Sequence, residues 1–241
     1  MSIAQTIQNT VEAMPAGQIF GYQELPSYAK SPGAVIKAIS RMVSDKSLER
    51  FSKGKFYVPK KGLFGMRKPS DGELIRSMLY KGGRLRGYVT GLSLYNQLGL
   101  TTQVPRTITV SYNGGRQEKE FGTIRIKTVV ARIPIQEKDV KFLQYLDALK
   151  DIKKIMDSDV NLSLKIMRRY ISELSDREQG RLVKLAQNYY SPQVRALVGL
   201  LFSSLKLSVP GSLSRSLNPT TIYKLKLDQS KWPMAREWNI R

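Results

Sequence analysis

The chain has 241 residues, of which 40 are lysine or arginine and 19 are aspartate or glutamate, so its formal net charge at pH 7 is +21. It contains no cysteine and no histidine, which excludes disulfides, thiolate or imidazole metal sites, cysteine nucleophiles and serine–histidine–carboxylate triads. Such a basic chain favours a polyanionic partner, because side chains that neutralise phosphates release condensed counterions.

The hydrophobic content of 41% is sufficient for a packed core, and the length predicts one large or two modest domains. The N-terminal residues lack the basic and long apolar stretches of a secretory signal. The longest apolar runs, such as residues 200–202, are far too short to cross a bilayer. We therefore expect a cytoplasmic protein. The basic residues are spread along the chain, which favours a folded domain with a positive face over a flexible basic arm.

The first predicted element is a helix at 3–13, in which Ile7 and Val11 share one apolar stripe. A short strand is expected next, at 18–20. A brief helix is predicted within 21–29.

The helix predicted at 32–44 is the most informative element of the chain. Ser31 suits the position of its N-cap and Pro32 suits its first turn. One face of the helix is apolar and is expected to pack onto the first helix; it carries Val35, Ile36, Ile39, Met42 and Val43. The opposite face alternates small residues with cations; it carries Ala34, Lys37, Ala38 and Arg41. Because small residues permit close approach and cations attract phosphates, this second face is predicted to read a major groove.

Residues 47–51 and 55–58 alternate like strands around a turn at 52–54, which predicts a hairpin with lysines at its tip. Together with the preceding helices, it gives the element order of a winged helix-turn-helix. Double-stranded DNA is favoured over RNA, because an α-helix fits the B-form major groove and not the narrow A-form groove. The predicted DNA-binding residues are Tyr22, Ser31, Ala34, Lys37, Ala38, Arg41, Lys53 and Lys55. The alternative is that these are ordinary solvated side chains of a small structural domain.

A linker is predicted at 61–70, where glycine, proline and lysine interrupt the hydrophobic periodicity. It separates the winged helix-turn-helix domain at 1–60 from a larger domain at 71–241. Helices at 71–81 and 91–98 are expected to begin the larger domain.

Residues 106–112 and 121–133 are rich in β-branched side chains and flank a turn, so they are predicted to pair as antiparallel strands. Beyond Pro134 the chain is predicted to be helical, with a final strand at 221–225. The predicted fold class is therefore α+β: an N-terminal winged helix-turn-helix domain followed by a larger mixed α+β domain with a helical C-terminal part.

The larger domain shows no catalytic constellation, and we expect no enzymatic activity, no metal and no cofactor. The glycine-rich segment at 81–87 lacks the full phosphate-loop pattern. Glu118 and Glu120 are expected to be solvated loop charges and not the metal ligands of a nuclease. A second candidate surface, for phosphate or for a protein partner, comprises Arg84, Arg86, Tyr88, Arg168 and Arg169.

Three features occur together within about residues 1–135: the short winged helix, its exit hairpin at 48–59, and the segment GYVTGLSLYNQLGL at 87–100. This combination resembles the AbiEi-type antitoxins of bacterial type IV toxin-antitoxin systems. The resemblance implies a first domain that binds inverted repeats at its own promoter. It also implies a second domain that counteracts a nucleotidyltransferase-like toxin from the same operon. The family's DNA-reading positions map onto the helix at 32–44 and onto the hairpin tip.

Two further hypotheses stay open. One is a winged-helix transcriptional regulator of a mobile element that has no toxin partner and whose later domain senses a ligand or dimerises. The other is an unusual nuclease, for which magnesium-dependent cleavage that requires Glu118 or Glu120 would be the evidence. The identity of the neighbouring gene separates the regulator from the antitoxin.

Overall fold

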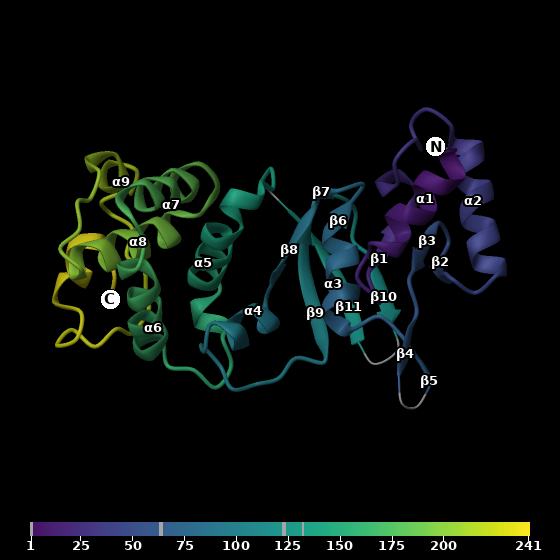
Figure 1. Cartoon of the computed structure of the whole chain (residues 1–241). Helices are drawn as coiled ribbons and strands as arrows, with labels where there is room; N and C mark the ends of the chain where they lie inside the picture. Colours follow the sequence, from purple (N-terminus) through teal and green to yellow (C-terminus); the bar gives the residue numbers. More distant parts are fainter. Residues whose placement is uncertain (1, 63–64, 122–123, 132) are drawn as a thin grey trace. The chain divides into compact units, whose positions relative to one another are not determined.

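The computed structural model describes residues 2–62, 65–121, 124–131 and 133–241. The chain divides into two compact units, Met1–Arg86 and Gly87–Arg241, which we call the N-terminal unit and the C-terminal unit (Figure 1). Helices and strands occur in both units, so the predicted α+β class is confirmed.

The N-terminal unit begins with two helices and a small sheet. Its first elements are α1 (Ile3–Glu12), β1 (Ile19–Gly21), the 3-10 turn η1 (Tyr22–Glu24), α2 (Pro32–Ser44), β2 (Glu49–Ser52) and β3 (Lys55–Tyr57). The strands form an antiparallel sheet in the order β1-β3-β2. This is the element order of a winged helix-turn-helix, in which the turn between β2 and β3 forms the wing. The brief helix predicted within 21–29 is reduced to η1.

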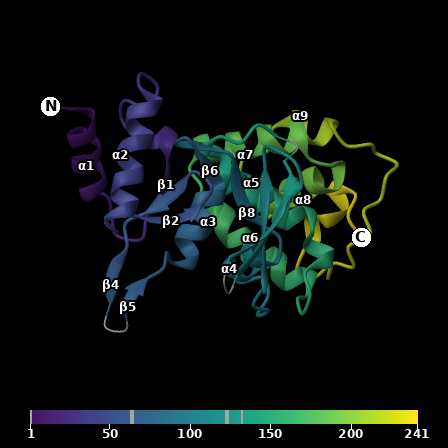
Figure 2. The same ribbon diagram turned by 90° about the vertical axis from the view of Figure 1, so that its right-hand side faces the viewer.

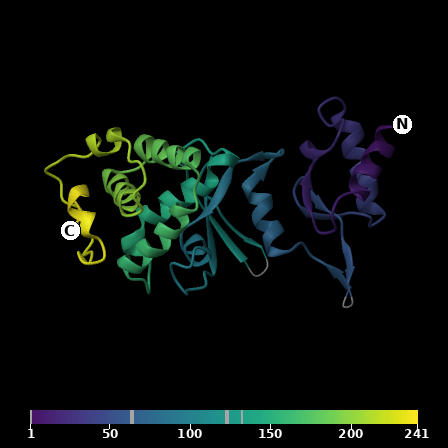
Figure 3. The same ribbon diagram turned by 60° about the vertical axis from the view of Figure 1, so that its left-hand side comes forward.

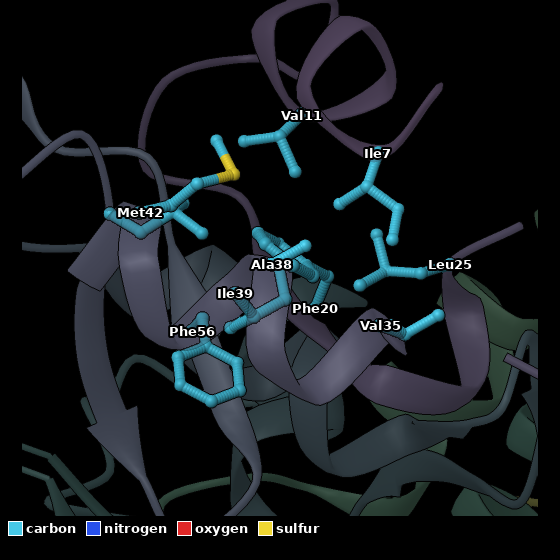
Figure 4. Packing of buried hydrophobic residues seen from close by; sticks show 10 residues of the cluster. Ile7, Val11, Phe20, Leu25, Val35, Ala38, Ile39, Met42 and Phe56 are labelled. Atoms are coloured by element: carbon cyan, nitrogen blue, oxygen red, sulfur yellow. The ribbon is translucent and has the colours of Figure 1, made fainter. Parts of the chain in front are cut away.

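The core of this unit lies where α1, α2 and the sheet meet (Figure 4). Figure 4 shows side chains from all three converging; the labelled ones are Ile7, Val11, Phe20, Leu25, Val35, Ala38, Ile39, Met42 and Phe56. The rings of Phe20 and Phe56, from β1 and β3, lie 6.3 Å apart between centroids. The core therefore fixes the rotation of α2 about its own axis, since the helix is held from two sides.

The rest of the N-terminal unit consists of two hairpins and a helix. These elements are β4 (Lys60–Gly62), β5 (Gly65–Arg67), α3 (Asp71–Leu79), β6 (Tyr80–Lys81) and β7 (Arg84–Leu85). Figure 2 shows α1 beside α2 and the β4–β5 hairpin extending away from the three-stranded sheet. In the tight β6–β7 hairpin, Gly82 and Gly83 both have positive φ, a conformation that favours glycine.

Helix α3 belongs to the N-terminal unit and is joined to its sheet by hydrogen bonds. The backbone N–H of Ile19 donates to Glu73 at 2.6 Å, and Arg76 donates to the carbonyl of Ile19 at 2.7 Å. Because β1 is an edge strand, this carboxylate–guanidinium pair satisfies both backbone groups that the sheet leaves open at Ile19.

The units therefore divide after Arg86, later than the linker predicted at 61–70. Strands β4 and β5 occupy half of that segment, in which residues 63 and 64 lie outside the described residues. The glycines and proline mark a hairpin and a helix start, and the side chains of α3 then tie the chain back to β1.

The C-terminal unit is built on a four-stranded sheet. Its strands are β8 (Gly87–Thr90), β9 (Thr107–Tyr112), β10 (Glu118–Phe121) and β11 (Ile124–Val130), and the short helix α4 (Leu92–Gln97) follows β8. The sheet order is β10-β11-β9-β8. Strands β9 and β11 run parallel, so the antiparallel pairing predicted for 106–112 and 121–133 is wrong. The antiparallel partner of β11 is β10, a strand too polar to be recognised in the sequence.

Helices lie on one side of this sheet (Figure 3). The helical elements are η2 (Glu137–Asp139), α5 (Val140–Lys150), η3 (Ile152–Lys154), α6 (Val160–Ser172), α7 (Asp176–Tyr189), α8 (Pro192–Ser204), α9 (Gly211–Arg215) and η4 (Pro233–Trp238). The helical character predicted beyond Pro134 is confirmed. The final strand predicted at 221–225 is reduced to a single bridge between Tyr223 and Ile240. In the part of the chain that the structure describes, no helix combines the length and apolar character that a bilayer crossing requires.

Helix α8 and the turn η4 pack closely at one glycine. A Cβ placed on Gly199 would lie 2.2 Å from the ring of Trp238, which is far inside van der Waals contact. The indole N–H of Trp238 donates to the hydroxyl of Ser203 at 3.0 Å. Trp238 is buried, with only 5% of the residue exposed. The absence of a side chain at Gly199 therefore allows the indole ring of Trp238 to pack directly against α8.

Candidate nucleic-acid interface

Helix α2 has one face in the core and one face in solvent. The buried face carries Val35, Ala38, Ile39 and Met42. The exposed face carries Gly33, Ile36, Lys37, Ser40, Arg41 and Ser44. The helix thus presents a narrow polar and basic strip to solvent.

Lys37 and Arg41 are the charged residues of this strip. They are four residues apart, so their side chains lie on the same face, one turn from each other. Among the described residues neither side chain has an ion-pair partner, and both are exposed. The rest of the strip consists of the small residues Gly33, Ser40 and Ser44 and of Ile36, which is 40% exposed. This face can approach a flat or grooved surface closely and offer two cations to it.

Ala38 was predicted to lie on the exposed face of α2, and this prediction is wrong. It is only 7% exposed and belongs to the core cluster, as Figure 4 shows, whereas Ile36, predicted to be buried, is 40% exposed. The prediction assumed one packing partner for the helix. Helix α2 instead contacts both α1 and the aromatic side chains of the sheet, which widens and rotates its buried arc.

We expect Ala38→Lys to destabilise the N-terminal unit. Overpacking alone costs about 1–3 kcal/mol, and burying the ammonium adds to this loss. Faster amide hydrogen exchange in α1 and α2, together with a lower unfolding midpoint, would show it. Ser40→Lys, on the exposed strip, is the matched control and should leave both measurements unchanged. Equal effects of the two variants would contradict the burial of Ala38.

The start of α2 holds two more predicted residues, Ser31 and Ala34, which are both half-exposed. Ser31 occupies the N-cap position and Pro32 the first turn, as predicted, but the Ser31 side chain makes no capping hydrogen bond. The first N–H groups of a helix have no intrahelical acceptor. This end of α2 therefore combines a hydroxyl with backbone donors.

Tyr22, also predicted to contact DNA, is used in packing. Its ring is stacked on that of Tyr28, with 5.9 Å between centroids, and meets Phe56 edge-on at 5.0 Å. The structure thus places Tyr22 as a wall of the core, with only part of its surface in solvent.

The wing carries Lys53 and Lys55 in different environments. Lys53 is exposed at the turn, beside Gly54, whose φ of +71° suits glycine. Lys55 instead donates its ammonium to the carbonyl of Ser77 in α3 at 2.7 Å. The prediction that Lys55 contacts a DNA backbone is therefore not supported by its position, since its charge already serves a contact within the N-terminal unit.

Three further cations near α2 and the wing were not predicted from the sequence. Lys30 and Lys46 are exposed two residues before and two residues after α2, and Arg50 is exposed on β2. The guanidinium of Arg50 lies 5.9 Å from the ring centroid of Phe56. The alternation of β2 signals that Arg50 points outward, but no pattern in the sequence singles out the two lysines at the helix ends.

The second candidate surface draws residues from both units: Arg84 and Arg86 belong to the N-terminal unit, and Tyr88, Arg168 and Arg169 belong to the C-terminal unit. Arg84 is exposed on β7, and Arg86 is half-buried with its N–H bonded to the carbonyl of Leu79 at 2.7 Å. Arg168, on α6, donates to the carbonyl of Ser204 at 3.0 Å.

Arg169 and Tyr88 are likewise engaged within the C-terminal unit. Arg169 lies over the ring of Tyr170 and 3.8 Å from Glu173. Tyr88 is 4% exposed and its hydroxyl donates to Asp147 at 3.1 Å, so it cannot stack on a base. The prediction for Tyr88 is wrong, because the residue faces the helices and not solvent.

Glu118 and Glu120 lie in β10 and not in a loop. Both carboxylates pair with Arg125 of the neighbouring strand β11, at 3.5 Å for Glu118. These are exposed cross-strand ion pairs, which hold a polar edge strand in register.

The N-terminal unit thus has the architecture of a winged helix-turn-helix domain, and the C-terminal unit is an α+β domain with helices on one side of its sheet. The chain belongs to a family of unknown function (DUF6088), whose family model matches residues 6–173. The match begins within α1, covers the rest of the winged helix and the sheet of the C-terminal unit, and ends just after α6. A comparison with curated proteins finds no match.

Proposed function

We propose that the chain binds double-stranded DNA through the exposed strip of α2 and through the wing. One observation carries this proposal: the core fixes α2 so that Lys37 and Arg41 face solvent together, among residues that, apart from Ile36, are small. A helix held in this way suits the B-form major groove, where cations reach base edges and phosphates. The net charge of +21 supports a polyanionic partner.

The contacts divide into two kinds. Lys37 and Arg41 are assigned to base edges or to the phosphates that flank the groove. Lys53 and Arg50, on the wing, are assigned to the phosphate backbone, where they set orientation without reading sequence. Ser31 and the first turn of α2 supply neutral donors for a further phosphate.

The biological role that we propose is that of an antitoxin. Its N-terminal unit would bind inverted repeats at its own promoter and repress transcription, and its C-terminal unit would counteract a co-encoded nucleotidyltransferase-like toxin. This part of the proposal is supported by the resemblance of residues 1–135 to AbiEi-type antitoxins. It implies a cytoplasmic, non-enzymatic protein that works beside DNA.

Binding of fluorescent duplexes tests the DNA proposal directly. The duplex upstream of the chain's own gene should bind more tightly than a scrambled duplex of the same length and composition, at a fixed salt concentration. Equal affinity for the two would reject sequence-specific recognition.

Co-expression tests the antitoxin role. A neighbouring nucleotidyltransferase should arrest growth when expressed alone, and the full chain should restore growth. Arrest that persists in the presence of the chain would reject the antitoxin role and favour a winged-helix regulator with no toxin partner.

Lys53→Ala should weaken binding to all duplexes alike, because a wing lysine contacts phosphate and not a base edge. The slope of log affinity against log salt should fall by about 1. Salt titrations of the operator and of the scrambled duplex measure both effects. Lys184→Ala, which removes an exposed charge from α7, is the control and should leave the slope unchanged. A loss confined to the operator duplex would instead place Lys53 on a base.

A further inference from the structure

The C-terminal unit contains a cavity of about 660 Å³ that is lined by both polar and apolar side chains. It lies between the face of the sheet that carries Tyr88 and Thr90, the end of α5, and the end of α7. Its volume falls within the range of about 300–1,000 Å³ that is usual for small-molecule sites. Nothing in the proposed DNA contacts uses this cavity.

The floor of the cavity is formed by a carboxylate that already accepts hydrogen bonds from several side chains. Asp147 is 5% exposed and accepts hydrogen bonds from the hydroxyls of Thr90 at 2.8 Å, Tyr88 at 3.1 Å and Tyr190 at 3.1 Å. The ammonium of Lys150 lies 3.0 Å from the same carboxylate. Burial and the charge of Asp147 raise the pKa of both tyrosines, so their hydroxyls stay protonated.

This arrangement sets the chemistry that the floor offers. The hydroxyls of Thr90 and Tyr190 use their hydrogens within this network and keep lone pairs on their oxygens, whereas the oxygen of Tyr88 already accepts hydrogen bonds from Ser111 and Tyr190. The floor therefore presents acceptors, which suit the hydroxyl or amino donors of a ligand.

The rim of the cavity is basic. Lys154 is 80% exposed at its side chain and lies 3.6 Å from Asp151, which Lys150 also approaches at 3.8 Å. Arg116 is exposed, and within the described residues its guanidinium has no ion-pair partner. The lining thus contains three cations and two carboxylates, and this excess of positive charge attracts an anion.

One wall of the cavity is apolar and partly exposed. Tyr189, the last residue of α7, is 44% exposed, and Val130 on β11 is 54% exposed. Exposed aromatic and aliphatic side chains beside a polar floor suit a flat ring. Such a ring stacks on an aromatic face whatever hydrogen-bonding groups lie along its edge.

We propose that this cavity binds a free nucleotide. The base would lie against Tyr189 and Val130, the sugar or base donors would meet the hydroxyls above Asp147, and the phosphates would lie at Arg116 and Lys154. The apolar wall suits a flat ring, the floor suits hydrogen-bond donors, and the basic rim suits a terminal negative charge. A nucleotide combines these three features. The cavity lies within the C-terminal unit, so nucleotide binding can be tested independently of the proposed DNA binding.

Isothermal titration of the full chain tests the proposal, with ATP, GTP, CTP and UTP as probes and inorganic tripolyphosphate as a probe of charge alone. At least one nucleotide should bind saturably and more tightly than tripolyphosphate. Removing the rim charges in Arg116→Ala/Lys154→Ala should weaken nucleotide binding at least about tenfold, because charged hydrogen bonds to phosphate are lost.

Two variants make the test specific. Tyr189→Ala should weaken nucleotide binding severalfold and leave tripolyphosphate binding unchanged, since it removes only the stacking surface. Lys184→Ala/Lys224→Ala removes the same charge from exposed positions outside the cavity and should change neither. These side chains are all exposed, so melting temperatures close to that of the unmodified chain will show that the variants fold. Absence of saturable binding, equal affinity for tripolyphosphate, or an equal loss in the control would overturn the proposal.

Discussion

Replacing Lys37 and Arg41 together with alanine is expected to remove most of the specific affinity of the chain for its operator. Each cation that contacts a base edge contributes about 1–3 kcal/mol, which corresponds to about 5- to 150-fold in affinity. If the two contacts are independent, their losses add, and the double variant should bind at least about 30-fold more weakly. Fluorescence anisotropy with the operator duplex, at one fixed salt concentration, measures this.

The control for this experiment must lose the same charge. Lys184→Ala/Lys224→Ala also lowers the net charge by two, from exposed positions in the C-terminal unit, and should change operator affinity little. The comparison separates a specific contact from the general attraction of a basic protein for DNA. If the Lys37/Arg41 variant bound the operator as the control does, α2 would not face DNA, and the proposed function would lose its central support.

Gly199→Ala is expected to destabilise the C-terminal unit, and Trp238→Ala is expected to reverse the sign of that effect. In the native chain the added methyl group collides with the indole ring, at a cost of about 1–3 kcal/mol for overpacking. Trp238→Ala alone should cost about 3–5 kcal/mol, because it empties a buried site. In the Trp238→Ala chain the methyl group has room, and alanine in place of glycine within α8 should stabilise the helix by up to about 1 kcal/mol.

Denaturant unfolding followed by tryptophan fluorescence provides the measurement. The chain has two tryptophans, Trp232 and Trp238, and both lie in the C-terminal unit, so the signal reports on that unit alone. Trp232 remains as the reporter in the Trp238→Ala chain. A destabilising effect of Gly199→Ala that persists in that background would show that the glycine is required for a reason other than the seat of the indole.

The boundaries of helices were predictable, because they depend on local signals. Proline in the first turn and the apolar period define α2 as Pro32–Ser44, which are the bounds that the structure has. The rotation of α2 was not predictable in the same way. Whether Ala38 or Ile36 is buried depends on how many elements pack against the helix, and periodicity alone assumes one.

Strand pairing and the cavity depend on contacts between residues far apart in the sequence. The turn after β9 looks like a hairpin turn, yet the strand that follows it, β10, pairs with β11 and not with β9. The alternating glutamates and lysine of β10 do not look like a strand in the sequence. The bonds from Tyr88 and Tyr190 to Asp147 join three separate elements. In the sequence Tyr88 stands beside two arginines, so it was interpreted as part of a basic surface.

The hydrogen bonds that join Glu73 and Arg76 of α3 to the backbone of Ile19 also restrict how two copies of the chain can associate. Inverted repeats are normally recognised by protomers related by a two-fold axis, and extension of a sheet across an edge strand is one common way to build such a dimer. Here Glu73 and Arg76 occupy the N–H and the carbonyl that a second β1 would need. Self-association by strand addition is blocked at this edge, so protomers that meet on a palindromic operator have to do so through another part of their surface.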